Sequence, residues 1–340
     1  MNCRPMNRAP RAWHPGWVGL LTMVALVPGR LGLAQGFEEG FLGEPSEVGW
    51  RVAGDPAQFV WDADAEVLRV TWDSARPNAY FARSLGTVLN RYDDFAFGFT
   101  IQLDEIAVGV ATGKPFTFEL AVGLVNWAGA TNLTFRRGTG NGSPNLVEFA
   151  YFPDSGYGAT VWPTVVGRDG RFNYQGRDDF TLLELRAGVR HRVQLEYSAA
   201  DQTLRTALWQ DGASAGPINA VRLTERFTDF AVDTLAICSY SDAGAQGSLR
   251  ATGWVDDIRV RVPPPPFERI AGRWADGHWQ VGFATRPNWT NWVYALERGH
   301  LATDWVTVGT DVISGPDGTL VLTDPEPLPD AFYRVRADKP

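Results

Sequence analysis

Hydrophobic and polar residues alternate along several segments in the first three quarters of the chain. In one of them, Phe95, Phe97, Phe99 and Ile101 are separated by small or polar residues. Because successive side chains of a strand point to opposite faces, this period of two predicts strands with one apolar face. We expect further strands over residues 116–124, 193–197, 204–208, 230–233 and 254–262. No window shows a sustained helical repeat.

Clusters of turn-forming residues separate these segments, as in Gly138-Thr139-Gly140-Asn141-Gly142-Ser143-Pro144. Many short strands with turns between them predict an all-β fold, an antiparallel two-sheet sandwich. Over about 225 residues a jelly roll fits better than a seven-stranded immunoglobulin type. The run Gly212-Ala213-Ser214-Ala215-Gly216 has the spacing of a serine-hydrolase elbow. It lacks the strand-to-helix context, so we expect a hairpin turn there.

Four consecutive prolines, residues 263–266, predict a stiff linker, because proline fixes the backbone and removes the amide donor. We place a jelly-roll domain at 35–262 and a small second β-sandwich at 267–340. In the second domain the pattern predicts six strands. They are expected at 269–274, 278–285, 292–297, 305–310, 319–323 and 332–336.

Residues 1–34 have the pattern of a secretory signal peptide. Arg4, Arg8 and Arg11 precede the short apolar run 18–27, and Gly32-Leu33-Ala34 provides small residues for cleavage before Gln35. The run is shorter than the roughly 20 residues that span a bilayer. We therefore expect a secreted or cell-surface protein, extracellular or periplasmic and bacterial. An N-terminal anchor or a buried helix is the alternative.

Composition adds constraints on partners and redox chemistry. The chain of 340 residues has 31 Lys+Arg, 39 Asp+Glu and a formal net charge of −8. Residues 1–34 hold four Arg and no acid, so the processed chain carries −12. Such a chain has no electrostatic reason to bind nucleic acid or anionic lipid, and we expect no membrane insertion. Of the two Cys, only Cys238 lies after the predicted cleavage site, which excludes an internal disulfide.

Two short stretches resemble strands of a known fold family. Gly36-Phe37-Glu38-Glu39-Gly40 and Trp254-Val255-Asp256-Asp257-Ile258-Arg259-Val260 resemble the edge strands of secreted concanavalin A-like lectin/glucanase domains and carbohydrate-binding modules. The C-terminal run 322–336 is similar to a fibronectin- or immunoglobulin-like module in secreted proteins of the Verrucomicrobia and their relatives. The resemblance implies a lectin-type jelly roll followed by an accessory β-module without a known catalytic role.

The same resemblance suggests where metal ions would bind. Glu148 and Asp154 match ligand positions of legume-type lectins, but Ala150 replaces the carboxylate that bridges their two ions. Jelly-roll modules also tie the first strand to the last through a structural calcium, for which Glu38 and Asp256 are the candidate ligands, with Glu39 and Asp257 as neighbours. A solvated acidic edge is the alternative. The three histidines after residue 34 show no zinc-type spacing.

Catalysis has weaker support in the sequence. Glycoside hydrolysis needs two carboxylates about 5–10 Å apart. In this fold family a Glu-x-Asp-x-Glu strand provides them, but the strands with Glu119 and Glu148 carry Ala121 and Ala150 at the partner positions. No catalytic residue is therefore assigned. A hydrolase or lyase that combines carboxylates from separate strands remains an alternative.

Aromatic and amide residues gather between positions 126 and 174. Aromatic rings stack on the apolar faces of sugars, and amides and charged groups bind their hydroxyls. We therefore predict non-catalytic binding of an extracellular polysaccharide or glycan. The candidate ligand-binding residues are Asn126, Trp127, Arg136, Tyr151, Asp154, Tyr157 and Trp162. Rings that pack the sandwich are the alternative, and a structural or adhesive cell-surface protein is the other candidate function.

Overall fold

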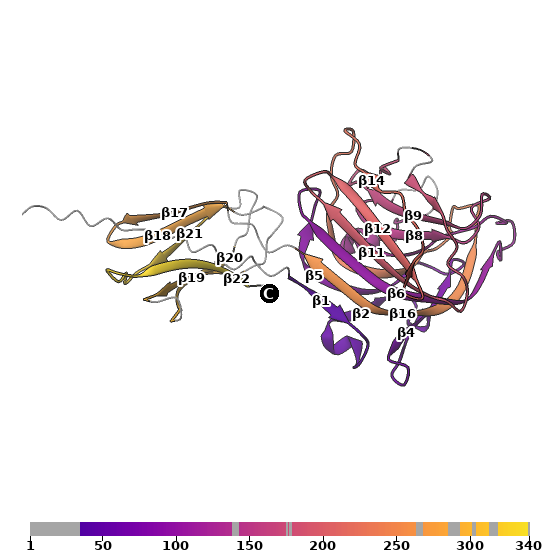
Figure 1. Ribbon diagram of the computed structural model, residues 1–340, viewed down its shortest axis with the longest axis horizontal. Helices are drawn as coiled ribbons and strands as arrows, with labels where there is room; N and C mark the ends of the chain where they lie inside the picture. Colours follow the sequence, from indigo (N-terminus) through magenta and orange to yellow (C-terminus); the bar gives the residue numbers. More distant parts are fainter. Residues whose placement is uncertain are drawn as a thin grey trace, which may run out of the picture. The chain divides into compact units, whose positions relative to one another are not determined.

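A computed structural model describes residues 35–137, 143–174, 176, 179–262, 268–284, 293–300, 304–312 and 319–338 (Figure 1). The predicted signal peptide (1–34) and proline linker (263–266) lie outside the described residues. The domain boundaries drawn from them remain predictions.

Two antiparallel sheets form the larger part of the described chain, which confirms the all-β jelly-roll sandwich. The nine-stranded sheet runs β13-β12-β11-β6-β16-β4-β3, with β1 paired to β16 and β14 to β12. Its strands are β1 (Gln35–Glu39), β3 (Phe59–Asp62), β4 (Val67–Asp73), β6 (Phe95–Val108), β11 (Arg190–Ser198), β12 (Thr203–Gln210), β13 (Ala213–Ser214), β14 (Val221–Arg222) and β16 (Leu249–Val262).

The seven-stranded sheet runs β10-β9-β8-β7-β15-β5-β2. Its strands are β2 (Trp50–Ala53), β5 (Ala79–Leu89), β7 (Leu120–Val125), β8 (Leu146–Phe152), β9 (Thr160–Val166), β10 (Thr181–Leu182) and β15 (Val232–Ser239). Two 3-10 turns, η1 (Pro45–Val48) and η2 (Pro56–Gln58), and the four-residue helix α1 (Trp127–Ala130) lie between strands.

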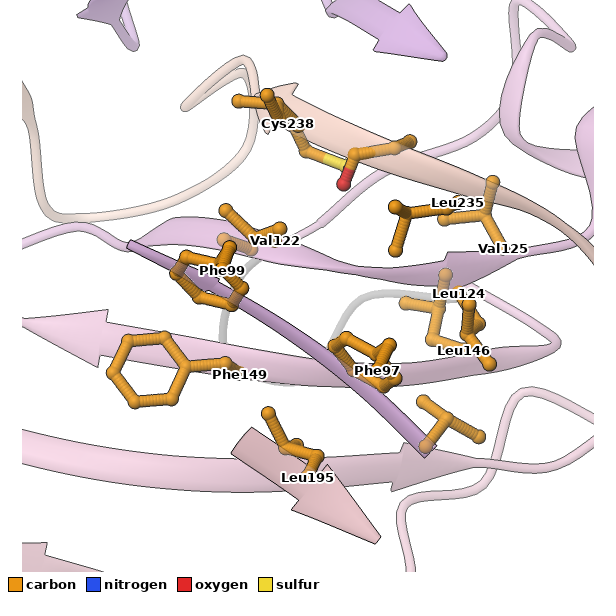
Figure 2. Packing of buried hydrophobic residues seen from close by; sticks show 14 of the residues in the cluster. Phe97, Phe99, Val122, Leu124, Val125, Leu146, Phe149, Leu195, Leu235 and Cys238 are labelled. Atoms are coloured by element: carbon orange, nitrogen blue, oxygen red, sulfur yellow. The ribbon is translucent and has the colours of Figure 1, made fainter. Parts of the chain in front are cut away.

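The apolar face predicted from the alternation in β6 is the core face. Phe97 and Phe99 are buried between the sheets, and Figure 2 shows their rings among residues of the opposite sheet. The ring centroids of Phe99 and Phe149 are 5.7 Å apart. Since paired sheets bury their facing side chains, the alternate residues of the same strands, such as Gly98 and Glu148, lie on the outer faces.

The two stretches that resemble edge strands pair with each other, but only one is short and peripheral. β1 pairs antiparallel with β16, with Glu38 opposite Arg259. β16 is a 14-residue strand inside the sheet, bonded to β6 on one side and to β4 and β1 on the other. The prediction of β16 as an edge strand was therefore wrong. Its first half pairs with β4 and its second half with β1, while β6 pairs along the other side.

The C-terminal part of the chain forms two three-stranded antiparallel sheets, ordered β17-β18-β21 and β20-β19-β22. All six strands predicted there are present: β17 (Glu268–Ala275), β18 (His278–Ala284), β19 (Val293–Gly299), β20 (Val306–Val312), β21 (Thr319–Asp324) and β22 (Phe332–Asp338). Val281, Phe283, Tyr294, Leu296, Leu320 and Leu322 form a shared apolar cluster. This is the small second β-sandwich expected from the pattern.

Two local predictions have different outcomes. Asp211 and Gly212 have positive φ angles and join β12 to β13, which confirms a hairpin turn instead of a hydrolase elbow. The strand expected from Phe116 begins only at Leu120, and Phe116 is 66% exposed. In the described part of the chain, no helix has the length and apolar character needed to cross a bilayer.

Candidate functional site

The outer face of the seven-stranded sheet brings together most of the chemically distinctive side chains. Glu148 is opposite Gly123 of β7, and Trp162 of β9 is opposite Ala150 of β8. Paired residues share a face, and Phe149 between Glu148 and Ala150 faces the core. Glu148, Ala150 and Trp162 therefore lie on the outer face.

A loop segment, residues 126–137, covers part of this face. The Asn126 side chain caps α1 by accepting the Gly129 amide at 3.0 Å. The hydroxyl of Tyr80 donates to the Ala130 carbonyl at 2.8 Å, and the ring of Phe135 stacks on Tyr240 with centroids 6.0 Å apart. The segment is thus attached to the sheet by both hydrogen bonds and ring packing.

The end of this segment inserts a buried charge into the face. Arg137 is 2% exposed and pairs with two carboxylates. Its Nε lies 2.9 Å from Glu148 Oε1, and its Nη2 lies 3.1 Å from Glu119 Oε2. The hydroxyl of Tyr240 donates to Glu148 Oε2 at 2.9 Å. We call Glu119, Arg137, Glu148 and Tyr240 the buried polar network.

The electrostatics of this network follow from its burial. Desolvation by itself would lower the pKa of Arg137, but Glu119 and Glu148 outweigh it and raise that pKa above its usual value. Burial, with a further contribution from Glu148, raises the pKa of the Cys238 thiol. Burial likewise raises the pKa of the Tyr240 hydroxyl. Arg137 therefore stays charged, and Cys238 and Tyr240 stay protonated, near neutral pH.

Five aromatic side chains form a second group beside the network. The Trp162 ring has its centroid 6.1 Å from Phe152, 6.3 Å from Phe172, 6.1 Å from Tyr174 and 6.5 Å from Phe180. We call these five residues the aromatic group. Tyr174 is 57% exposed, and the other four are half-buried. The Arg137 guanidinium lies 5.3 Å from the Phe172 centroid and so links the group to the network.

Trp127, Asn126 and Arg136 have structural contacts of their own. The Trp127 ring lies between the Arg51 guanidinium, 4.1 Å from its centroid, and the edge of Tyr80. Its amide donates to Asp233 Oδ1 at 2.9 Å. The exposed Arg136 donates to the carbonyls of residues 133 and 135. Asn126 and Trp127 thus hold the loop segment in place, and Arg51 covers one face of the half-buried Trp127 ring.

The structure corrects the prediction for Tyr151. This residue is 1% exposed and faces the core, where its hydroxyl accepts the Leu185 amide at 3.1 Å. Because burial raises its pKa to about 12, the hydroxyl stays neutral. Tyr151 therefore cannot stack on a sugar in this conformation. Tyr151 lies two residues after Phe149 on β8, so both side chains point to the core face.

Asp154 and Tyr157 lie on the exposed loop between β8 and β9. Asp154 Oδ1 accepts the Gly156 amide at 3.0 Å, and Tyr157 is 70% exposed. Both are accessible to a ligand. Their loop lies between Phe152 and Trp162, two members of the aromatic group.

Sequence reasoning missed Arg137 and Tyr240 and did not connect Glu119 with Glu148. The signal available was weak: Arg137 is one of two adjacent arginines before a glycine-rich turn. Tyr240 follows a strand whose outer face carries small residues, Ala236 and Cys238. Such a face leaves room for a side chain inserted from a loop. The alternation of hydrophobic and polar residues does not indicate which side chain fills that room.

The predicted metal ligands do not form a complete site among the described residues, where no group of three or more His, Cys, Asp or Glu lies together. Glu38 is exposed opposite Arg259, and burial raises the pKa of Asp256. Glu39 accepts from the Phe41 amide and from Trp50 Nε1, both at 2.8 Å. The calcium prediction remains untested.

Comparison with known proteins gives only structural likeness. No family model and no curated protein matches this sequence. Lectin II from Ulex europaeus is 13% identical, with 66% of this chain and 98% of that chain covered and a TM-score of 0.41. The Lotus tetragonolobus seed lectin is 12% identical, with coverage of 68% and 100% and a TM-score of 0.40.

An alginate lyase mutant in complex with an alginate trisaccharide is 11% identical, with 62% of this chain and 88% of that chain covered and a TM-score of 0.36. At such identities and TM-scores these neighbours carry no argument about family, site or activity, which must come from this chain's own residues.

Proposed function

We propose that this protein is a secreted, non-catalytic binding protein for an extracellular glycan, with its site on the outer face of the seven-stranded sheet around Trp162. The observation that carries the proposal is the aromatic group. Five rings gather beside a buried polar network, and Tyr174 and part of Trp162 are open to solvent.

The chemistry of this surface suits a sugar. Flat rings that are partly exposed bind the apolar face of a pyranose and lose little conformational entropy on binding. The packing of Phe152, Phe172 and Phe180 around Trp162 holds the ring before a ligand arrives, which reduces the ordering cost. Asp154 and Tyr157 on the neighbouring loop are accessible polar groups for sugar hydroxyls.

A glycan array followed by affinity gels tests the proposal. The variants are Trp162→Ala and Tyr174→Ala, with Tyr92→Ala as the control, because Tyr92 is 61% exposed on the turn between β5 and β6. We expect retention of the wild type and of Tyr92→Ala, and loss in both site variants. Unchanged retention in Trp162→Ala and Tyr174→Ala would remove these residues from the site.

The enzyme alternative has a test of its own. Glu119 and Glu148 meet on one guanidinium, but they are 2% and 0% exposed and so do not face an open cleft. We expect no sugar release from polysaccharide pools. Release that Glu148→Gln abolishes, with the folded state intact, would establish a hydrolase or lyase instead. Absence of any glycan retention would favour the structural or adhesive protein.

A further inference from the structure

A hollow lies on the outer face of the nine-stranded sheet, on the opposite side of the sandwich from the aromatic group. It is a groove of about 400 Å³, a size within the usual range of small-ligand sites. It follows β6 where this strand lies between β11 and β16 (Figure 1). Ala96 and Gly98 line its floor, and a strand with such small outward residues leaves the face hollow.

The strand register places guanidinium groups on both sides of this floor. Gly98 is opposite Arg259 of β16 and Gln194 of β11, and Thr100 is opposite Arg192 of β11. Neighbouring strands are about 4.8 Å apart. Arg192, opposite Thr100, and Arg259, opposite Gly98, therefore flank β6 from its two sides.

Within the described part of the chain, neither of these two arginines has an ion pair. The guanidinium of Arg192 lies 4.1 Å from the centroid of the Trp209 ring. A guanidinium stacked by its face keeps its N–H edges available for a ligand. Arg261, further along the same rim, is already paired with Glu196 at 3.4 Å.

Two acidic residues also line the groove. Glu38 belongs to β1, on the side of Arg259 away from Gly98. Asp257 accepts a hydrogen bond from the hydroxyl of Thr100 on β6 at 3.1 Å. The groove thus offers both hydrogen-bond donors and acceptors.

We propose that this groove binds a carboxylate-bearing sugar residue of an acidic polysaccharide, with the carboxylate between Arg192 and Arg259. Guanidinium groups bind carboxylates through charge-assisted and often bidentate hydrogen bonds. Gln194, Asp257 and Glu38 accept hydrogen bonds from the sugar hydroxyls. A purely anionic ligand has no hydroxyls and would leave these acceptors without a donor. The site is separate from the aromatic group, which lies on the other sheet.

Binding to polygalacturonate, measured by titration on the full chain, tests this site. The methyl-esterified polymer serves as the uncharged probe and dextran sulfate as the sulfated one. The double variant Arg192→Gln/Arg259→Gln removes both central charges. Arg205→Gln is the matched control, because Arg205 is also exposed on β12 and is paired with Asp201. Trp162→Ala reports on the opposite face.

We expect polygalacturonate to bind wild type, Arg205→Gln and Trp162→Ala alike, and the double variant at least about tenfold more weakly, as for loss of a charged hydrogen bond. Binding should weaken in about 0.5 M salt and be absent with the methyl ester.

Equal binding by the double variant, loss in Trp162→Ala, or no binding by the wild type overturns the proposal. Preference for dextran sulfate over polygalacturonate overturns the choice of a carboxylate. Loss of glycan retention in Trp162→Ala alone leaves this groove intact, so the two proposals fail separately.

Discussion

Arg137 provides the positive charge that allows two glutamates to be buried on the outer face of the seven-stranded sheet. Replacing it by Met leaves Glu119 and Glu148 without a countercharge. Removal of one partner from a buried ion pair costs about 3–5 kcal/mol. We expect Arg137→Met to lower the free energy of unfolding by that amount in urea titrations at neutral pH.

Arg171→Met is the control for this variant. Arg171 pairs with Asp169 at 3.4 Å, but its side chain is 81% exposed, and exposed ion pairs contribute little. Its unfolding curve should match that of the wild type. Equal stability of Arg137→Met and wild type would show that the buried polar network does not hold the loop segment.

His191 gives a pH dependence of known sign. It is 1% exposed on the core face of β11. Burial lowers the pKa of His191. The Val189 carbonyl and Asp211 offset part of this decrease, and Arg186 adds to it. Below about pH 6.5 the unfolded chain binds a proton that the folded chain does not. Stability therefore falls as pH falls through that value.

The expected slope is at most about 1.4 kcal/mol per pH unit for one proton. His191→Leu should lose this contribution. The unfolding free energy of the variant minus that of the wild type should therefore increase from pH 7 to pH 5. His278→Gln is the control, because its ring is half-exposed and in contact with the Pro325 carbonyl. Parallel pH profiles for His191→Leu and wild type would contradict the assignment.

For single residues, the sequence predicted which residue types would form the site better than it predicted where their side chains lie. Trp162 was a predicted platform and lies in the aromatic group, but Tyr151 has the parity of the core face. A strand with apolar residues on both faces, as in β8, gives no alternation that separates them. The pairing of Arg137 with Glu119 and Glu148 depends on a loop crossing two strands, and no local pattern encodes such a contact.

At the scale of elements, Gly123 of β7 holds the sheet close under the buried polar network. A Cβ at this position would lie 2.5 Å from the Cα of Glu148 and 2.6 Å from the Val147 carbonyl oxygen. Backbone atoms of a paired strand cannot move aside without disturbing the ladder. We expect Gly123→Ala to cost about 1–3 kcal/mol, the usual cost of overpacking, in thermal or urea unfolding.

Gly282→Ala is the matched strand control. A Cβ there would be 3.7 Å from Val321 Cγ2, an ordinary contact, in β18. Its stability should stay equal to that of the wild type or rise slightly. If both alanine variants unfold like the wild type, the close approach of β7 and β8 is not a constraint on the site.

Strands were predictable where one face is polar, as in β6, β11 and β12, whose alternation identified the core directly. The C-terminal strands were found for the same reason. Strand neighbours were not predictable, because pairing of β16 with β6, β4 and β1 depends on contacts between residues far apart in sequence. That pairing decides which outer face holds which side chains.

In the whole molecule, the two outer faces of the large sandwich carry different kinds of side chains. The seven-stranded sheet carries the aromatic group and the buried polar network, and the nine-stranded sheet carries the arginine-flanked groove. The acidic charge of the chain, −8 over all 340 residues, favours solubility and gives no general attraction for polyanions. Binding of an acidic polymer would therefore depend on the groove itself.

Glycan binding at Trp162 can be measured as an affinity. The quantity is the dissociation constant for the glycan best retained in the array, titrated against wild type, Trp162→Ala and Tyr92→Ala, with thermal unfolding to verify that each variant is folded. We expect at least about a tenfold loss of affinity for Trp162→Ala, as for truncation of a central aromatic anchor, and none for Tyr92→Ala. Equal affinities of folded Trp162→Ala and wild type would contradict it.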